Sequence, residues 1–318
     1  MHSKPVLIES PVLVLVGPTA IGKTALALEL AARFGCEIVS VDSMQVYRYM
    51  DIGTAKPTRE ERDRAPHHLI DVADPDEQYD AARFVREGLA AIERITKKGG
   101  VPLLTGGTGL YLKALLHGLF ETPGSADQAL RLELRERLRQ EGRDALFGQL
   151  QRVDPESAGR IHPNDTQRLL RALEIYLSSG KTWSECLREQ QESRPVRFRR
   201  LLQLGLTCER SLLYRRIDER TKLMIKQGLV AEVERLRAMG YGPELPSMQA
   251  IGYRHVNNVL DGTWDLDEAT RLLQRDTRRY AKRQLTWFGS DPALHWFDRE
   301  EGGLLLARVE TWLKEKSG

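Results

Sequence analysis

The residues GPTAIGKT at positions 17–24 match the phosphate-binding loop G-x-x-x-x-G-K-[ST]. Glycines let backbone amides turn inward around an oxyanion, and the following helix adds partial positive charge at its N-terminus. In this pattern Lys23 reaches the terminal phosphates of the ligand, and the Thr24 hydroxyl can hold Mg²⁺. We therefore expect a phosphate site built from Gly17, Pro18, Thr19, Ala20, Ile21, Gly22, Lys23 and Thr24.

Asp42 follows EIVSV at 37–41, a short apolar run typical of a strand. Catalytic groups collect at the carboxyl ends of parallel strands. This carboxylate could therefore ligate Mg²⁺ or accept a proton from a nucleophile, and the alternative is a helix N-cap. A second glycine turn, GGTG at 106–109, could bring Thr108 to the same place, although a tight turn explains its glycines equally well.

Arg220 lies in a predicted helix, SLLYRRIDERTKLM at 211–224, on the same face as Leu213, Ile217 and Met224. An arginine on an apolar face needs an anionic partner, because an unpaired buried charge is costly. That partner is either a structural carboxylate or the phosphates of a bound ligand, which suit guanidinium geometry.

A basic stripe recurs at helical spacing near the C-terminal end of the chain, opposed within its window only by Asp276. Two aromatic residues, Trp287 and Phe288, follow it, and cations beside stacking rings are typical of nucleic-acid binding. A solvated helix face is the alternative. The stripe consists of Arg271, Arg275, Arg278, Arg279, Lys282 and Arg283. The adjacent His67 and His68 lack further ligands at metal spacing and are interpreted as structural.

Strand and helix patterns alternate through the first part of the chain, which predicts a mostly parallel sheet with helices on both faces. The expected strands are 12–16, 37–41, 69–72 and 101–105, and the expected helices include 23–34 and a segment ending near 117. Residues 121–199 read as an all-helical insertion, after which 201–207 returns to the sheet and long helices run to the end. The predicted organisation is a P-loop NTPase-like α/β core from 1–120 and 200–318, a helical insertion at 121–199, and a basic helix at about 265–288.

The composition is that of an ordinary globular protein, since 41% hydrophobic and 29% charged residues exclude disordered, collagen-like and disulfide-rich classes. Three scattered cysteines, Cys36, Cys186 and Cys208, form no CxxC pair, so we expect a reducing compartment and no metal cluster. The apolar run 12–16 is too short to span a membrane and leads into the glycine loop. We expect a cytoplasmic protein with no membrane association and no obligate protein partner.

Over residues 11 to 290 the chain resembles the tRNA dimethylallyltransferases, also called tRNA isopentenyltransferases. The resemblance is carried by a dense set of motifs rather than by the phosphate loop alone. These motifs are GPTAIGKT, SVDSMQVYRYMDIGTAKP (40–57), PHHLIDV (66–72), GGTGLYLKALL (106–116), RIHPNDTQRLLRALE (160–174), AIGYR (250–254) and TRRYAKRQLTWF (277–288).

The resemblance implies transfer of a dimethylallyl group from dimethylallyl diphosphate to N6 of the adenosine 3′-adjacent to the anticodon, tRNA position 37. The phosphate loop would then hold the donor's diphosphate with Mg²⁺, and Asp42 would accept the proton of the amine. Lys23, Thr24 and Arg220 would stabilise the leaving diphosphate. The helical insertion would embrace the anticodon stem–loop. The implied RNA path comprises Asp42, Ser43, Met44, Gln45, Thr108, Arg131, Gln167, Arg168, Leu169, Leu170, Arg171, Gln249, Ala250, Ile251, Gly252, Tyr253, Arg254, Lys282, Arg283, Gln284, Leu285, Thr286, Trp287 and Phe288.

Two positions depart from the family pattern. Gly289 stands where an arginine usually follows KRQLTWF, and Tyr49 stands where a glycine is common. Two other functions compete with the transferase. A P-loop kinase would use ATP on a nucleoside or small alcohol with Asp42 as its base, but leaves the basic stripe and the insertion without a purpose. A non-enzymatic RNA-binding protein leaves the phosphate loop unexplained.

Overall fold

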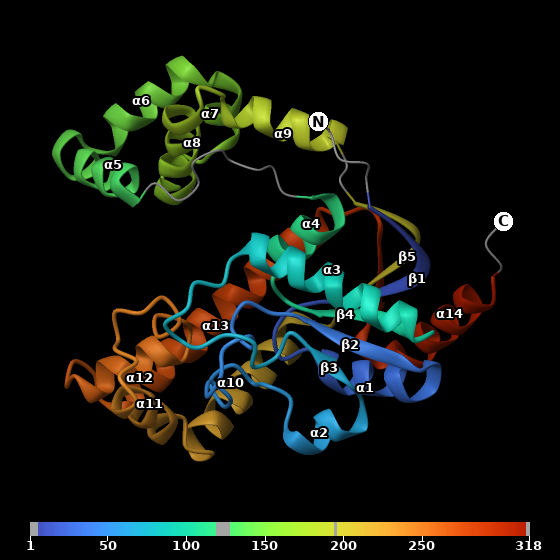
Figure 1. Ribbon diagram of the computed structural model, residues 1–318. Helices are drawn as coiled ribbons and strands as arrows, with labels where there is room; N and C mark the ends of the chain where they lie inside the picture. Colours follow the sequence, from blue (N-terminus) through green and yellow to red (C-terminus); the bar gives the residue numbers. More distant parts are fainter. Residues whose placement is uncertain (1–5, 119–127, 194–195, 316–318) are drawn as a thin grey trace. The chain divides into compact units, whose positions relative to one another are not determined.

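The computed structural model describes residues 6–118, 128–193 and 196–315. The chain divides into two compact units, and each is described by itself. The smaller unit comprises Met1–Val6 and His117–Val196, and the larger comprises Leu7–Leu116 and Arg197–Gly318. Figure 1 draws the chain coloured along its sequence, with the helices of the smaller unit in green and yellow.

The larger unit is built on a six-stranded sheet of order β3-β2-β4-β1-β5-β6. The pairs β1–β4, β2–β4, β2–β3 and β5–β6 are parallel. The strands are β1 (Val6–Val16), β2 (Cys36–Val41), β3 (His67–His68), β4 (Val101–Gly106), β5 (Val196–Thr207) and β6 (Leu294–Asp298). The helices of this unit are α1 (Lys23–Phe34), α2 (Arg59–Arg64), α3 (Ala81–Lys97), α4 (Gly109–His117), α10 (Arg210–Lys226), α11 (Leu229–Ala238), α12 (Tyr253–Leu260), α13 (Leu266–Gly289) and α14 (Gly302–Lys314), with a short 3₁₀ turn at Arg299–Glu301.

The two faces of the sheet carry separate cores, which explains why β1 reads as a continuous apolar run. Val12, Val14 and Val16 pack with residues of α3 and α4, whereas Leu13 and Leu15 pack with residues of α1 and α14. Figure 1 shows α3 on one side of the sheet and α1 and α14 on the other. The predicted parallel α/β fold is confirmed, and it brings the ends of β1, β2 and β4 to one edge.

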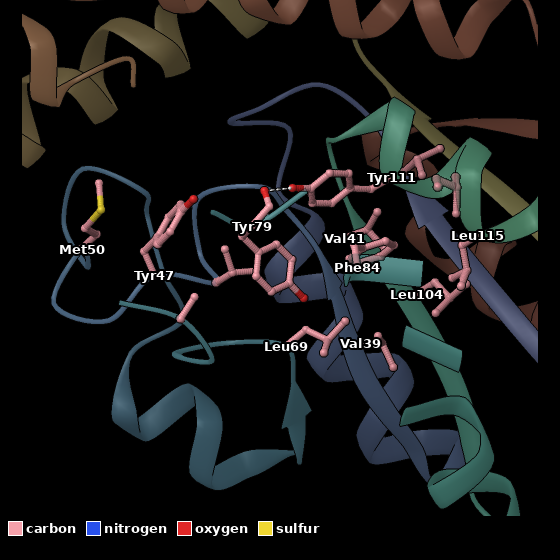
Figure 2. Packing of buried hydrophobic residues seen from close by; sticks show 14 of the residues in the cluster. Val39, Val41, Tyr47, Met50, Leu69, Tyr79, Phe84, Leu104, Tyr111 and Leu115 are labelled. Atoms are coloured by element: carbon pink, nitrogen blue, oxygen red, sulfur yellow. Dashed lines mark hydrogen bonds between the residues drawn. The ribbon is translucent and has the colours of Figure 1, made fainter. Parts of the chain in front are cut away.

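The first of these cores is closed by aromatic residues, as Figure 2 shows. Phe84 of α3 stacks on Tyr111 of α4 with ring centroids 4.6 Å apart. The Tyr111 hydroxyl donates a hydrogen bond of 3.0 Å to the Tyr79 carbonyl. These contacts fix α4, and hence the glycine turn before it, against the sheet.

The predicted strand at 69–72 is wrong. The strand at this position is β3, two residues earlier, where His67 pairs with Ile38 and His68 with Val39. Leu69 and Asp71 have φ of 62° and 56°, and such left-handed residues cannot continue a strand. Asp71 instead turns its carboxylate toward buried Lys56, 2.6 Å away.

Two further boundaries differ from the sequence prediction. Strand β5 begins at Val196, five residues before the expected start at 201. The long helices expected to run to the end are interrupted by β6, which pairs with β5 from Gln203 opposite Leu294 to Thr207 opposite Asp298. Trp296 of β6 lies so close to Gly205 that a Cβ there would sit 2.7 Å from its ring. A segment with three apolar residues in five offers too little periodicity to predict this strand.

Within the described residues, the smaller unit consists of helices. Leu134, Leu146, Leu150, Leu169 and Leu173 form its separate core. The carboxylates of Asp154 and Asp165 each cap the helix that follows, where they accept from the amides of Ser157 and Arg168. The helices are α5 (Gln128–Glu141), α6 (Arg143–Val153), α7 (Pro155–Arg160), α8 (Thr166–Ser179) and α9 (Trp183–Ser193).

Candidate active site

The phosphate loop connects β1 to α1 in an anion-binding geometry. Gly17 has φ of 152°, and a Cβ on it would lie 2.7 Å from the Leu206 carbonyl oxygen, so only glycine fits. Gly22, with φ of 107°, is the N-cap of α1 and supplies no side-chain acceptor for the first helical amides. A bound anion can therefore accept from this helix start. Ala20 also adopts a left-handed conformation, with φ of 65°.

Lys23 is folded back onto this loop, where its Nζ donates to the carbonyls of Gly17 and Pro18, both at 2.9 Å. Burial, aided by the neighbouring positive charge of Arg220 and opposed by Asp42, lowers the pKa of Lys23 to about 7. An amine with so low a pKa can take up a proton, and so become charged, when an anion binds beside it.

Arg220 projects from α10 toward the phosphate loop, where its Nη2 donates to the Thr19 hydroxyl. Among the described residues it forms no salt bridge, so the structural carboxylate considered from the sequence is absent there. One turn earlier, Arg216 donates its Nε to the Ala20 carbonyl at 2.8 Å. Burial holds the pKa of Arg220 below its ordinary value, the charge of Asp42 opposes this shift, and the nearby Arg216 adds to it. Two guanidinium groups without carboxylate partners beside a phosphate loop favour a polyanionic ligand.

Asp42 lies at the end of β2, and the residues that follow it form a turn, so the helix N-cap considered as the alternative is wrong. One of its oxygens instead caps that turn. Asp42 Oδ1 accepts from the amides of Met44 at 2.8 Å and Gln45 at 3.2 Å. The same carboxylate lines the cavity described below, so capping and chemistry are compatible. The glycine turn at 106–109 does reach this place, because the Ser43 amide donates to Thr108 Oγ1 at 3.0 Å.

These groups open onto one cavity of about 520 Å³ in the larger unit. Its polar wall contains Lys23, Thr24, Asp42, Arg216 and Arg220. Its remaining lining includes apolar side chains from several elements, namely Ala27, Ile38, Ala55, Pro57, Ile70 and Leu223. A cavity lined by both cations and apolar side chains suits a ligand with a phosphate head and a hydrocarbon tail.

The donor groups around the cavity fit Mg²⁺ better than a transition metal. Thr24 and Asp42 offer oxygen atoms, and the described residues contain no group of three His, Cys, Asp or Glu side chains able to hold a metal ion. Mg²⁺ is commonly bound by one or two protein oxygens, with water and substrate phosphates completing its shell.

The residues expected to line an RNA path divide into exposed and buried sets. Lys282, Arg283, Thr286, Trp287 and Gln249 are exposed. Several others face the protein interior: Leu169 and Tyr253 are 0% exposed, Phe288 3% and Gln284 5%. Their side chains pack in cores or bind other loops, so they cannot touch RNA in this conformation. Arg131 and Arg171 both bind the buried Glu174, at 2.8 and 2.9 Å.

The basic stripe on α13 is more neutralised than its sequence suggests. Arg271 binds Glu268 at 2.6 Å, Arg275 binds Asp276 at 2.9 Å and Arg278 binds Asp218 at 2.6 Å. Asp218 comes from α10, which the window on α13 could not reveal. Lys282 and Arg283 are exposed and form no salt bridge within the described part of the chain.

Sequence reasoning missed Glu232 of α11, which organises one wall of the cavity. This carboxylate is 1% exposed and accepts from the amides of Asp51, Ile52 and Gly53, at 2.8 to 3.1 Å. The Tyr253 hydroxyl donates to it at 2.7 Å. The loop it holds continues into Thr54 and Ala55, which line the cavity. No local pattern marks Glu232, because the loop amides that it binds are about 180 residues away in the sequence.

The two departures from the family pattern have distinct structural settings. Tyr49 has φ of 67°, a left-handed conformation that explains why a glycine suits this position. Gly289 ends α13, and a Cβ there would meet no atom within 4 Å. A longer side chain therefore fits at Gly289.

The fold and the site define a P-loop-type α/β protein with a cationic cavity at the carboxyl ends of its strands. The family model described as IPP transferase matches residues 45–291. A tRNA dimethylallyltransferase of Desulfotalea psychrophila is 52% identical over 309 residues, which cover 97% of this chain and 98% of that protein. A second, from Geobacter sulfurreducens, is 50% identical and covers 91% of this chain and 92% of its own.

Solved structures give the same result. A tRNA isopentenylpyrophosphate transferase of Bacillus halodurans has a TM-score of 0.71 at 40% identity, covering 99% of this chain and 98% of its own. A eukaryotic dimethylallyltransferase, described as acting on tRNA, has a TM-score of 0.74 at 31% identity, covering 92% of this chain and 74% of its own. The chain belongs to the tRNA dimethylallyltransferase family.

This result confirms the predicted family and the prediction of a prenyl-transferring enzyme, and it does not support the kinase alternative. None of the helices in the described segments combines the length and apolar character needed to cross a bilayer.

Proposed function

We propose that this protein transfers a dimethylallyl group from dimethylallyl diphosphate to N6 of adenosine 37 in tRNA and releases diphosphate. The observation that carries the proposal is the convergence of the phosphate loop, Asp42 and Arg220 on one cavity with apolar walls. The phosphate side suits the diphosphate, and the apolar side suits a branched five-carbon chain. A tRNA substrate also agrees with a cytoplasmic location.

In the reaction the donor's C1–O bond breaks as the bond from N6 to C1 forms. Negative charge then builds on the leaving diphosphate, where Lys23 and the guanidinium of Arg220 lie ready to neutralise it. Arg216 adds a third cation beside the loop. Mg²⁺, held by the Thr24 hydroxyl, would supply further positive charge to the diphosphate.

The exocyclic amine of adenine is a poor nucleophile and loses a proton during transfer. Asp42 accepts that proton, because one of its oxygens is oriented by two backbone amides and its carboxylate opens on the cavity. The target base must leave its stack to reach this group. Diphosphate departs with the electron pair of the broken C1–O bond.

The acceptor RNA is held by phosphate contacts and by stacking. In the larger unit, the exposed cations Lys282 and Arg283 and the 38% exposed ring of Trp287 are suited to this. In the smaller unit, Gln167 and Arg168 at the start of α8 are candidates for the anticodon stem–loop.

The proposal is tested with undermodified tRNA, dimethylallyl diphosphate and Mg²⁺ in the absence of ATP. We expect N6-dimethylallyladenosine by mass spectrometry of the digested tRNA, together with free diphosphate. RNA binding without product for any prenyl donor would refute the proposal, as would Mg-dependent ATP turnover stimulated by a small acceptor.

A further inference from the structure

The side chain of Gln284 on α13 bridges two loops at the ends of neighbouring strands. Its Oε1 accepts from the Thr19 amide at 2.8 Å, and its Nε2 donates to the Gly107 carbonyl at 2.9 Å. The side chain is 5% exposed, so both ends of the amide are bound within the protein. Gln284 therefore belongs to the structure of the site rather than to its RNA-facing surface.

The bridge lies beyond the point where β1 and β4 stop pairing. The last register pair between these strands is Val16 with Gly106. From there one chain turns into the phosphate loop and the other into the turn before α4. Gln284 reconnects them, and a Cβ on Gly107 would lie 2.1 Å from its Nε2, so only glycine leaves room for the amide.

The two bridged loops carry different halves of the chemistry. On one side, the Thr19 hydroxyl accepts from Arg220, and the loop continues to Lys23. On the other side, Thr108 accepts from the amide of Ser43, which follows Asp42. The separation between these two loops therefore sets the position of a bound diphosphate relative to Asp42, the carboxylate proposed to accept the proton.

We propose that Gln284 is a positioning residue that fixes the donor-binding loop relative to the acceptor-side turn. The inference rests on the proposed function, because it concerns the distance between donor carbon and acceptor nitrogen. Reacting atoms must approach to about 3–3.5 Å, and a misplacement of 1 Å can cost about 100-fold in rate. The effect of Gln284 therefore falls on the chemical step more than on ligand binding.

Tyr280, one turn earlier on α13, supports this role for the helix face. Burial and the Asp42 carboxylate raise the pKa of the Tyr280 hydroxyl, and hydrogen bonds from Thr108 and Gln284 partly oppose that rise. The same face of α13 thus contacts the acceptor-side turn through two consecutive turns of helix.

The first test replaces Gln284 by methionine, which keeps its length and removes both hydrogen bonds. We expect the single-turnover rate with tRNA, dimethylallyl diphosphate and Mg²⁺ to fall by roughly 10- to 100-fold. The Kd of inorganic pyrophosphate should stay within about threefold, because the cations that bind it are untouched. Gln274→Met is the matched control on the same helix, since that amide makes only a long bond of 3.4 Å to the Asp218 carbonyl.

The second test breaks the bridge from its other end with Gly107→Ala. The new methyl group would displace the tip of a flexible side chain, so the protein should fold even where Gln284→Met does not. The double variant should react no more slowly than the slower of the two single variants, because both changes disrupt the same bridge.

Unchanged single-turnover rates in folded Gln284→Met or Gly107→Ala would overturn the proposal, and so would losses that multiply in the double variant. A loss accounted for by a reduced folded fraction, measured by thermal unfolding, would also overturn it. Failure of the proposed function itself is distinguishable, because the wild-type protein would then yield no modified nucleoside.

Discussion

Two groups of cations in the larger unit differ in their partners. Lys23, Arg216 and Arg220 surround the phosphate loop without carboxylate partners among the described residues, whereas Arg271, Arg275 and Arg278 on α13 each bind an acid. Burial makes it costly for the first group to carry charge, Asp42 offsets that cost only in part for Lys23 and Arg220, and a bound anion would offset more of it. The second group is satisfied before any ligand arrives. Cations that are withdrawn from solvent and form no salt bridge, rather than the number of cations, distinguish the proposed active site.

The largest expected effect concerns Asp42, the anion among the unpaired cations. Asp42→Asn keeps an oxygen able to accept from Met44 and Gln45 but removes the base, so we expect turnover to fall by roughly 10²–10⁴-fold. The Kd values of pyrophosphate and tRNA should change much less. The measurement is steady-state kinetics beside binding titrations, and near-normal turnover would leave Asp42 with the cap alone.

Arg220→Ala should reduce kcat by about 10²–10³-fold, because it removes charge stabilisation from the leaving diphosphate. No salt bridge is lost, so thermal stability should hold or rise as a desolvated cation disappears. Activity and the thermal midpoint are measured together. A large fall in the midpoint with unchanged activity per folded molecule would reassign Arg220 to structure. Arg278→Ala provides the contrast, because it breaks an ion pair with Asp218 and leaves the cations beside the phosphate loop in place.

The lowered pKa of Lys23 predicts a proton uptake. A bound anion should raise this pKa from about 7 toward its ordinary value of 10.5, so pyrophosphate binding above pH 7 takes up a proton. Without Mg²⁺, affinity should therefore fall with rising pH by up to about tenfold per unit between the two values. Calorimetry in two buffers of different ionisation enthalpy measures the uptake at pH 8.5.

Lys23→Gln is the control for this pH dependence and should remove the part that Lys23 contributes, leaving the part that comes from the ionisation of pyrophosphate itself. In the empty wild-type protein, the same shift makes the free energy of unfolding rise with pH between about 7 and 10.5, because the unfolded chain binds more protons there. An affinity independent of pH in the wild-type protein would contradict a neutral Lys23 in the empty site.

The smallest expected effect lies on α13. Lys282→Gln with Arg283→Gln should weaken tRNA binding on the order of tenfold and reduce the salt slope by about two units. Arg275→Gln with Arg279→Gln, whose guanidinium groups lie 2.9 and 3.7 Å from Asp276, should reduce that slope less. Binding titrations from low to high salt compare the pairs. Equal salt slopes for the two double variants would show that the salt bridges to Asp276 do not reduce the contribution of Arg275 and Arg279 to tRNA binding.

Local patterns in the sequence were sufficient for the phosphate loop and for most of the sheet. A glycine loop between an apolar run and an amphipathic helix is encoded within about twenty residues, and α1 spans the predicted Lys23–Phe34. Strands β2 and β4 were equally readable, since continuous apolar runs are buried on both faces. The family followed from motifs distributed along the whole chain.

Other features depended on residues far apart in the sequence. The short β3, the edge strand β6 and the pairing of Arg278 with Asp218 come from long-range contacts that no local period records. The inward orientation of Gln284 was also invisible, because a polar residue on a basic helix reads as surface until the helix packs. The sequence by itself determined the phosphate-loop motif and the α/β framework. Only the tertiary structure decided which charges remained unpaired, since pairing depends on what the fold brings within reach.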